Sequence, residues 1–121
     1  MPSKIRLNRI SDRIQKELSE MLVTGKINDP RVESAYITDV TVDRELYVAK
    51  IYISALAGSE AKQEILQGFQ HAAGYLRSVL SKIIPLRTFP ELRFIWDETP
   101  ERAERIEELL DSLKQEYEDN E

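Results

Sequence analysis

Hydrophobic residues recur at spacings of three and four in three long stretches of the chain, residues 3–24, 59–85 and 99–117. Side chains spaced in this way share one face of an amphipathic helix, and that face is normally buried. Ser59 and Thr99 stand where an N-cap is expected for the second and third stretches. The pattern therefore predicts three long helices.

Between the first two predicted helices the composition changes to residues that favour strands. Residues 36–42 are rich in Tyr, Ile, Thr and Val, and the polar residues 43–45 separate them from residues 47–54. In the second run apolar side chains alternate with Lys50 and Ser54, which is typical of a half-buried strand. The pattern predicts a β-hairpin.

A third strand is predicted over residues 92–96, where apolar and other side chains alternate after Pro90. The long middle helix has Gly74 near its centre. Glycine costs about 1 kcal/mol relative to Ala in a helix, so we expect a bend or a close backbone approach there. The order is α-β-β-α-α-β with a further helix, an α+β fold in which helices cover one face of a three-stranded sheet.

Charge is divided unevenly along the chain. Residues 1–96 hold 14 Lys and Arg against 11 Asp and Glu, a net of +3, whereas residues 97–121 hold 3 against 11, a net of −8. A polyanionic partner responds to the local field of one face rather than to the whole-chain charge of −5. We expect a body over 1–98 and an acidic C-terminal helix and tail over 99–121, packed on that body or extending from it.

The first predicted helix carries a basic stripe beside its apolar stripe. At about 100° per residue the two stripes are separated by roughly a third of a turn. Such cations either form a solvated face or neutralise phosphates, which positions a protein on RNA without reading sequence. The candidate RNA-binding residues on this stripe are Arg6, Arg9, Arg13 and Lys16.

Several kinds of chemistry have no support in the sequence. The chain has no Cys, which excludes disulfides and thiolate ligands, and His71 is its only imidazole. The adjacent carboxylates Asp97 and Glu98 are typical of a turn before a helix rather than of a metal site or an acid/base pair. We expect no catalytic residue, no metal, no cofactor and, without a run of about 20 apolar residues, no membrane span.

Short motifs spread over most of the chain resemble the bacterial ribosome-binding factor A family, whose fold is a type II KH domain. The motifs follow the family's order and spacing, which makes the set more specific than any one of them. They are Arg6–Ile10, Asp29–Arg31, Ala49–Ser54, Ala72–Arg77, Pro90–Phe94, Asp97, Arg105–Ile106 and Leu109–Leu110.

The resemblance implies a particular joint in the middle helix. The chain lacks the Gly-x-x-Gly loop by which KH domains approach nucleotides. The resembled family has instead an interhelical Ala-x-Gly kink, which is matched here by Ala72, Ala73 and Gly74. Ala103 departs from the Gly expected in the last helix.

The resemblance also implies a function. It predicts a non-enzymatic, monomeric cytoplasmic factor that binds free 30S small ribosomal subunits, assists their late maturation and supports efficient 16S rRNA processing and growth in the cold. The expected contact is the 5′-terminal helix region of 16S rRNA, and ribosomal proteins or an assembly GTPase are further candidate partners.

Further cations outside the first helix are second-rank RNA-binding candidates, because each is nearly as compatible with a role that only keeps the surface soluble. They are Arg31, Lys50, Arg77, Lys82, Arg87 and Arg93. The alternative function is a protein-binding adaptor that acts through the acidic C-terminal helix, with the basic stripe incidental.

Overall fold

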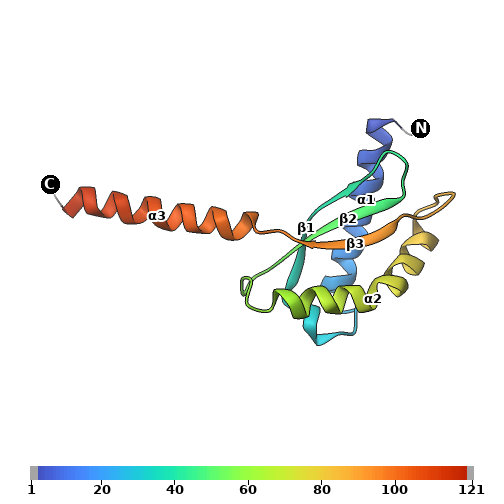
Figure 1. Ribbon diagram of the computed structural model, residues 1–121, viewed down its shortest axis with the longest axis horizontal. Helices are drawn as coiled ribbons and strands as arrows, with labels where there is room; N and C mark the ends of the chain where they lie inside the picture. Colours follow the sequence, from blue (N-terminus) through green and yellow to red (C-terminus); the bar gives the residue numbers. More distant parts are fainter. Residues whose placement is uncertain (1–2, 120–121) are drawn as a thin grey trace.

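The computed structural model describes residues 3–119, so the outermost residues of the two expected segments, 1–2 and 120–121, lie outside it. The described chain is an α+β fold with one three-stranded sheet, as expected. Its elements in chain order are α1 (Lys4–Val23), the short 3₁₀ helix η1 (Pro30–Val32), β1 (Ala35–Val42), β2 (Val48–Ala55), α2 (Lys62–Ile83), β3 (Glu91–Trp96) and α3 (Thr99–Asp119) (Figure 1).

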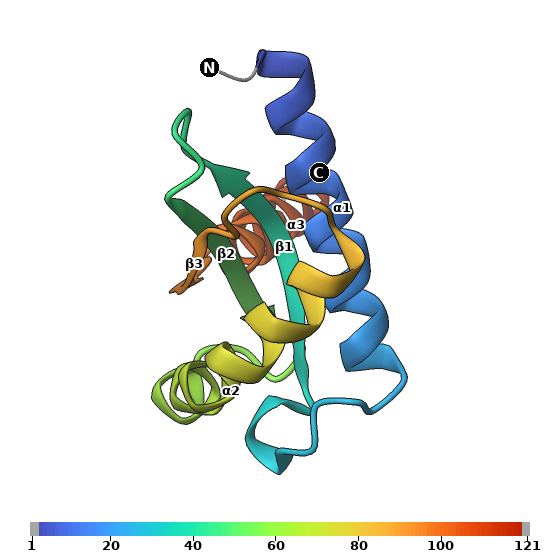
Figure 2. The ribbon, with the colours of Figure 1, turned by 90° about the vertical axis from the view of Figure 1, so that its right-hand side faces the viewer.

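The sheet has the strand order β1-β2-β3. β1 and β2 form the predicted antiparallel hairpin, with a bulge between Ile37 and Asp39, whereas β3 lies parallel to β2. A parallel neighbour requires a crossover connection, which α2 supplies. Both α1 and α2 pack on the face of the sheet that carries Ala49, Ile51 and Ile53, and the other face carries Lys50 (Figure 2).

The core lies between this face and the two helices. The predicted stripe of α1 is buried at Ile10, Ile14 and Leu18. Phe69 of α2 is fully buried, and its ring stacks on that of Phe94 in β3 with centroids 5.1 Å apart. Each such side chain contributes about 1.5–3 kcal/mol by burial, so α1, α2 and the sheet are held as one unit.

α1 ends as the sequence indicates. Gly25 has a φ of +70°, in the left-handed region that glycine adopts at low cost. The Gly25 N–H donates to Leu22 O (3.3 Å) and the Lys26 N–H donates to Met21 O (3.0 Å). These two bonds form a Schellman motif, which satisfies carbonyls that the last turn would otherwise leave free.

Two predicted N-caps were wrong. α2 is preceded by Ala61 without a side-chain cap, and Ser59 lies further upstream, where its carbonyl accepts from the Lys62 N–H (3.1 Å). Thr99 is the first residue of α3 rather than its cap, because Asp97 Oδ1 accepts from the Thr99 N–H (2.9 Å). A carboxylate is a strong acceptor for a helix-entry N–H, so the helix begins earlier than expected.

α2 is one continuous helix that changes direction along its length, which Figure 2 shows as a lime half and a yellow half at an angle. These two halves correspond to the paired α segments of the type II KH order. Gly74 is exposed, and a Cβ added there would meet no atom within 4 Å. A close backbone approach therefore does not explain this glycine.

The close approach occurs instead at Gly68, which sequence reasoning did not single out. A Cβ at Gly68 would lie 2.9 Å from Val32 Cγ1 and 3.2 Å from Arg31 Cβ, both in η1. Because η1 packs directly on the N-terminal half of α2 at this point, the loop of the Asp29–Arg31 motif is held against the helix.

α3 projects away from the body, so that the C-terminal end of this helix lies far from the sheet (Figure 1). Every side chain from Arg102 to Glu118 is exposed. The amphipathic pattern that predicted α3 is real, but its apolar side is not covered by any other part of the described chain.

Candidate RNA interface

The basic stripe lies on the solvent side of α1, because the other side of the helix is buried against the sheet. All four cations are exposed, and α1 is a straight run of helix through them, so they form one row. The row, which we call the α1 basic stripe, consists of Arg6, Arg9, Arg13 and Lys16.

One member of the α1 basic stripe is paired within the helix. Arg13 Nε donates to Glu17 Oε1 at 3.0 Å, an i,i+4 pair in which the Arg13 side chain is 50% exposed. An exposed pair of this kind contributes only about 0.3–0.5 kcal/mol, so a phosphate can readily replace the carboxylate. Within the described residues Arg6, Arg9 and Lys16 make no ion pair.

A groove beside the β3 edge brings together three residues that the sequence marked separately. Lys50 and Arg93 are neighbours in the β2–β3 register, and Ala73 of α2 lines the same groove. Arg93 also lies 3.5 Å from Glu91, so the groove carries both signs of charge. The groove could hold a strand of RNA, but it carries less positive charge than the α1 basic stripe.

Arg31 is engaged with its neighbour Asp29. Its guanidinium donates from Nε to Oδ1 (3.0 Å) and from the terminal nitrogen to Oδ2 (2.7 Å), while Asp29 also accepts from the Arg31 N–H. These hydrogen bonds hold the pKa of Asp29 at about 2. The pair caps η1, which gives Arg31 a local role besides any contact with RNA.

Arg77 is also engaged, in a way that the sequence did not reveal. Its guanidinium donates to the backbone carbonyls of Phe89 and Pro90, just before β3. Because these carbonyls come from a loop 12 and 13 residues downstream, the arginine ties α2 to the entry of the strand. Lys82 and Arg87 are exposed at the end of α2 and in the following loop.

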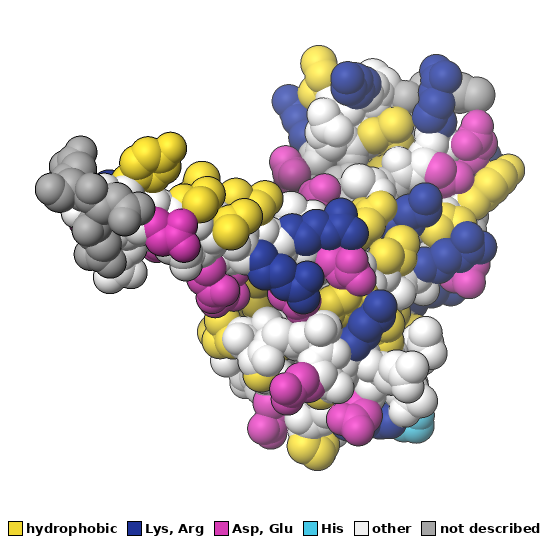
Figure 3. Space-filling view, turned by 60° about the vertical axis from the view of Figure 1, so that its left-hand side comes forward, with side chains coloured by type: hydrophobic (Ala, Val, Ile, Leu, Met, Phe, Trp, Pro, Cys, Tyr) yellow, Lys and Arg dark blue, Asp and Glu magenta, His cyan; other side chains and the backbone are white. Residues whose placement is uncertain are grey.

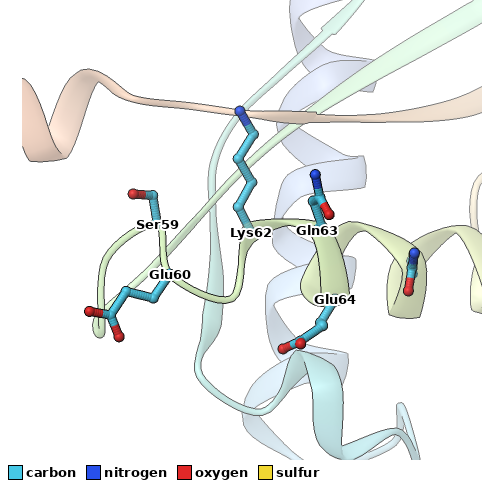
Figure 4. A pocket seen from close by; sticks show the side chains of 6 residues that line it. Ser59, Glu60, Lys62, Gln63 and Glu64 are labelled. Atoms are coloured by element: carbon cyan, nitrogen blue, oxygen red, sulfur yellow. The ribbon is translucent and has the colours of Figure 1, made fainter.

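A polar hollow at the start of α2 is unsuited to an anion (Figure 4). Lys62 points to one side of it, but Glu60 and Glu64 bring two carboxylates to the same helix start. Two negative charges oppose the attraction that a helix N-terminus has for phosphate. Among the described residues, no group of three or more potential metal ligands occurs.

Asp97 joins the body to α3. Its Oδ2 accepts from the Thr38 hydroxyl (2.7 Å) and its Oδ1 from the Thr99 N–H, and these bonds lower its pKa. The expectation that Asp97 is a helix-entry residue rather than an acid/base group is in keeping with this geometry. No helix within residues 3–119 is long and apolar enough to cross a membrane.

Comparison with known proteins agrees with this arrangement. The family model described as ribosome-binding factor A matches residues 6–110. The chain belongs to this family. A ribosome-binding factor A from Nitrosomonas europaea is 42% identical over 85% of this chain and 87% of its own length. Another, from Alcanivorax borkumensis, is 44% identical over 92% of this chain and 81% of its own length.

Solved structures of ribosome-binding factor A proteins share the fold. The crystal structure of the Thermus thermophilus protein superposes with a TM-score of 0.64, at 19% identity, over 74% of this chain and 93% of its own. A solution structure from Thermotoga maritima gives 0.66 at 27% identity, over 78% of this chain and 90% of its own. The type II KH-like order predicted for this chain is thus confirmed.

Proposed function

We propose that this chain binds the free 30S ribosomal subunit through the α1 basic stripe and assists the late steps of its maturation. The observation that carries the proposal is the exposed row of cations on α1, in a chain whose total charge is −5. Both curated relatives are named ribosome-binding factor A, and a Thermus thermophilus homology model has been fitted into a map of a 30S complex. The names of these relatives and the exposed α1 basic stripe both support binding to the 30S subunit.

The contacts would position the protein rather than read a sequence. Guanidinium groups bind phosphate oxygens bidentately, and each bound phosphate releases counterions. A protein that prefers one RNA conformer stabilises that conformer without any bond chemistry. We therefore propose a non-enzymatic role, in the cytoplasm, with the 5′-terminal helix region of 16S rRNA as the contact and efficient rRNA processing as the result.

The groove at the β3 edge is the second surface in this proposal. Lys50 and Arg93, which lie on the sheet face opposite α1, would contact a separate segment of the RNA. A kink at Ala72–Gly74 stays a prediction, and it would set the angle of the groove. Arg31, Arg77, Lys82 and Arg87 stay predictions, of which Arg31 and Arg77 are already held by other groups of the chain.

The test is co-sedimentation with purified 30S subunits. Arg9→Glu combined with Arg13→Glu removes two charged contacts and adds two repulsive ones, which should weaken binding on the order of 100-fold or more. The matched control is Arg44→Glu with Arg105→Glu, which makes the same charge change at exposed residues outside the stripe. Circular dichroism and urea denaturation confirm that both variants fold.

Unchanged co-sedimentation of the α1 variant would refute the proposal. An equal loss in both variants would also contradict it, since the effect would then follow from net charge alone. The alternative function, a protein-binding adaptor to which the basic stripe is incidental, has one observation in its favour, the exposed apolar side of α3.

A further inference from the structure

α3 carries an apolar row with the spacing of a coiled-coil seam. The intervals along it are three, four, three and four residues, and two heptads fit between its first and last members. We call this row the α3 seam; it consists of Ala103, Ile106, Leu110, Leu113 and Tyr117. Ile106 and Leu110 are 59% and 58% exposed, and Leu113 and Tyr117 are also exposed.

The seam is held away from the chain's own core. Only residues 97 and 98 connect β3 to α3, and Asp97 is bound on one side to Thr38 and on the other to the Thr99 N–H. Glu98 adds an ion pair to Arg102 at 2.9 Å. Because the connection is this short and this well bonded, α3 points outward and its seam faces solvent.

Charge decides what can cover the seam. Figure 3 shows apolar side chains along one side of α3 and acidic ones along another. The helix holds 8 acidic side chains against 3 basic ones, with Glu104, Glu108 and Asp111 on the side opposite the seam. This field repels RNA phosphates, and it also repels a second copy of α3, which carries the same net negative charge.

We infer that the α3 seam docks on a basic amphipathic helix of a protein component of the 30S subunit. The inference rests on the proposed function. A cationic helix complements the net charge of α3, while an apolar stripe on that helix buries the seam. Glu107, Lys114 and Glu116 flank the seam with both signs and so set the register of the pair.

The experiment measures the affinity of the full chain for purified 30S subunits over a series of salt concentrations. Leu110→Ala combined with Leu113→Ala removes apolar contact without changing charge, and it should weaken binding at least tenfold. The slope of affinity against salt should not change, because no phosphate contact is lost. Ser112→Ala with Gln115→Ala, on the other side of α3, is the control: it also shortens two exposed side chains without changing charge, and it should change affinity less than threefold.

A photo-crosslinker at position 109, which adjoins the seam, identifies the contact directly. The expected product on 30S subunits joins the chain to a ribosomal protein. A crosslink to 16S rRNA, a crosslink to a second copy of the chain, or an unchanged affinity of the Leu110→Ala/Leu113→Ala variant would overturn the inference. If the unsubstituted chain does not bind 30S subunits, the proposed function itself is wrong. This outcome differs from failure of the inference, in which the unsubstituted chain binds and the Leu110→Ala/Leu113→Ala variant binds equally well.

Discussion

The body and α3 place equally regular apolar stripes in opposite surroundings. In α1 and α2 the stripes at Ile14 and Phe69 are fully buried against the sheet, whereas in α3 Leu110 and its neighbours remain exposed. The charges are opposite as well, since the solvent side of α1 is basic and that of α3 is acidic. An apolar stripe therefore indicates that a helix needs a partner, but not whether the partner is part of the same chain.

The largest contrast concerns stability. Phe69→Ala removes a fully buried ring that stacks on Phe94, and it should lower the free energy of unfolding by about 3–5 kcal/mol. Leu113→Ala removes a side chain of α3 that touches no core, and the change should stay within about 0.5 kcal/mol. Urea denaturation measures both. A comparable loss in the two variants would mean that α3 packs on the body.

A second contrast concerns two glycines of α2. Gly68→Ala places a Cβ 2.9 Å from Val32 Cγ1, so it should cost about 1–3 kcal/mol through forced repacking. Gly74→Ala meets no atom within 4 Å and should stabilise the protein by about 0.5–1 kcal/mol. Thermal unfolding compares the two. A stabilising Gly68→Ala would show that η1 does not hold α2 closely.

The smallest stability effect concerns pH. The pKa of Asp29 is lowered from 3.8 to about 2, and that of Asp97 is lowered as well. A depressed native pKa stabilises the folded state above the unfolded pKa, and this contribution is lost as pH falls from about 4 towards 2. Asp97→Asn should therefore flatten the acid limb of the stability profile, measured by urea denaturation between pH 2 and 6. An unchanged limb would show that the Thr38 contact is not maintained in solution.

The fold was predictable where periodicity alone decides it. Helical and alternating patterns predicted α1, the hairpin, β3 and α3, because each pattern determines which side chains share one face of the element. The starts of α2 and α3 were not predictable to the residue. Ser59 accepts from the Lys62 N–H through its carbonyl rather than its side chain, and at the start of α3 the acceptor is Asp97 rather than Thr99.

The candidate site was predictable only in part, for a similar reason. The α1 basic stripe depends on spacing within one helix, and it is exposed as expected. Arg77 and Gly68 depend on contacts with Phe89 and Val32, which come from other parts of the chain, and no local pattern reveals them. The grouping of Lys50 with Arg93 likewise requires the parallel register of β2 and β3.

We propose that the body, rather than α3, contacts rRNA phosphates. The most direct test is the salt dependence of affinity for 30S subunits, compared among the unsubstituted chain, Arg9→Gln on α1 and Arg105→Gln on α3. Loss of one phosphate contact should reduce the log-log slope of the Arg9 variant by about one unit and leave that of the Arg105 variant unchanged. An unchanged slope for Arg9→Gln, or an equal reduction for Arg105→Gln, would contradict the account.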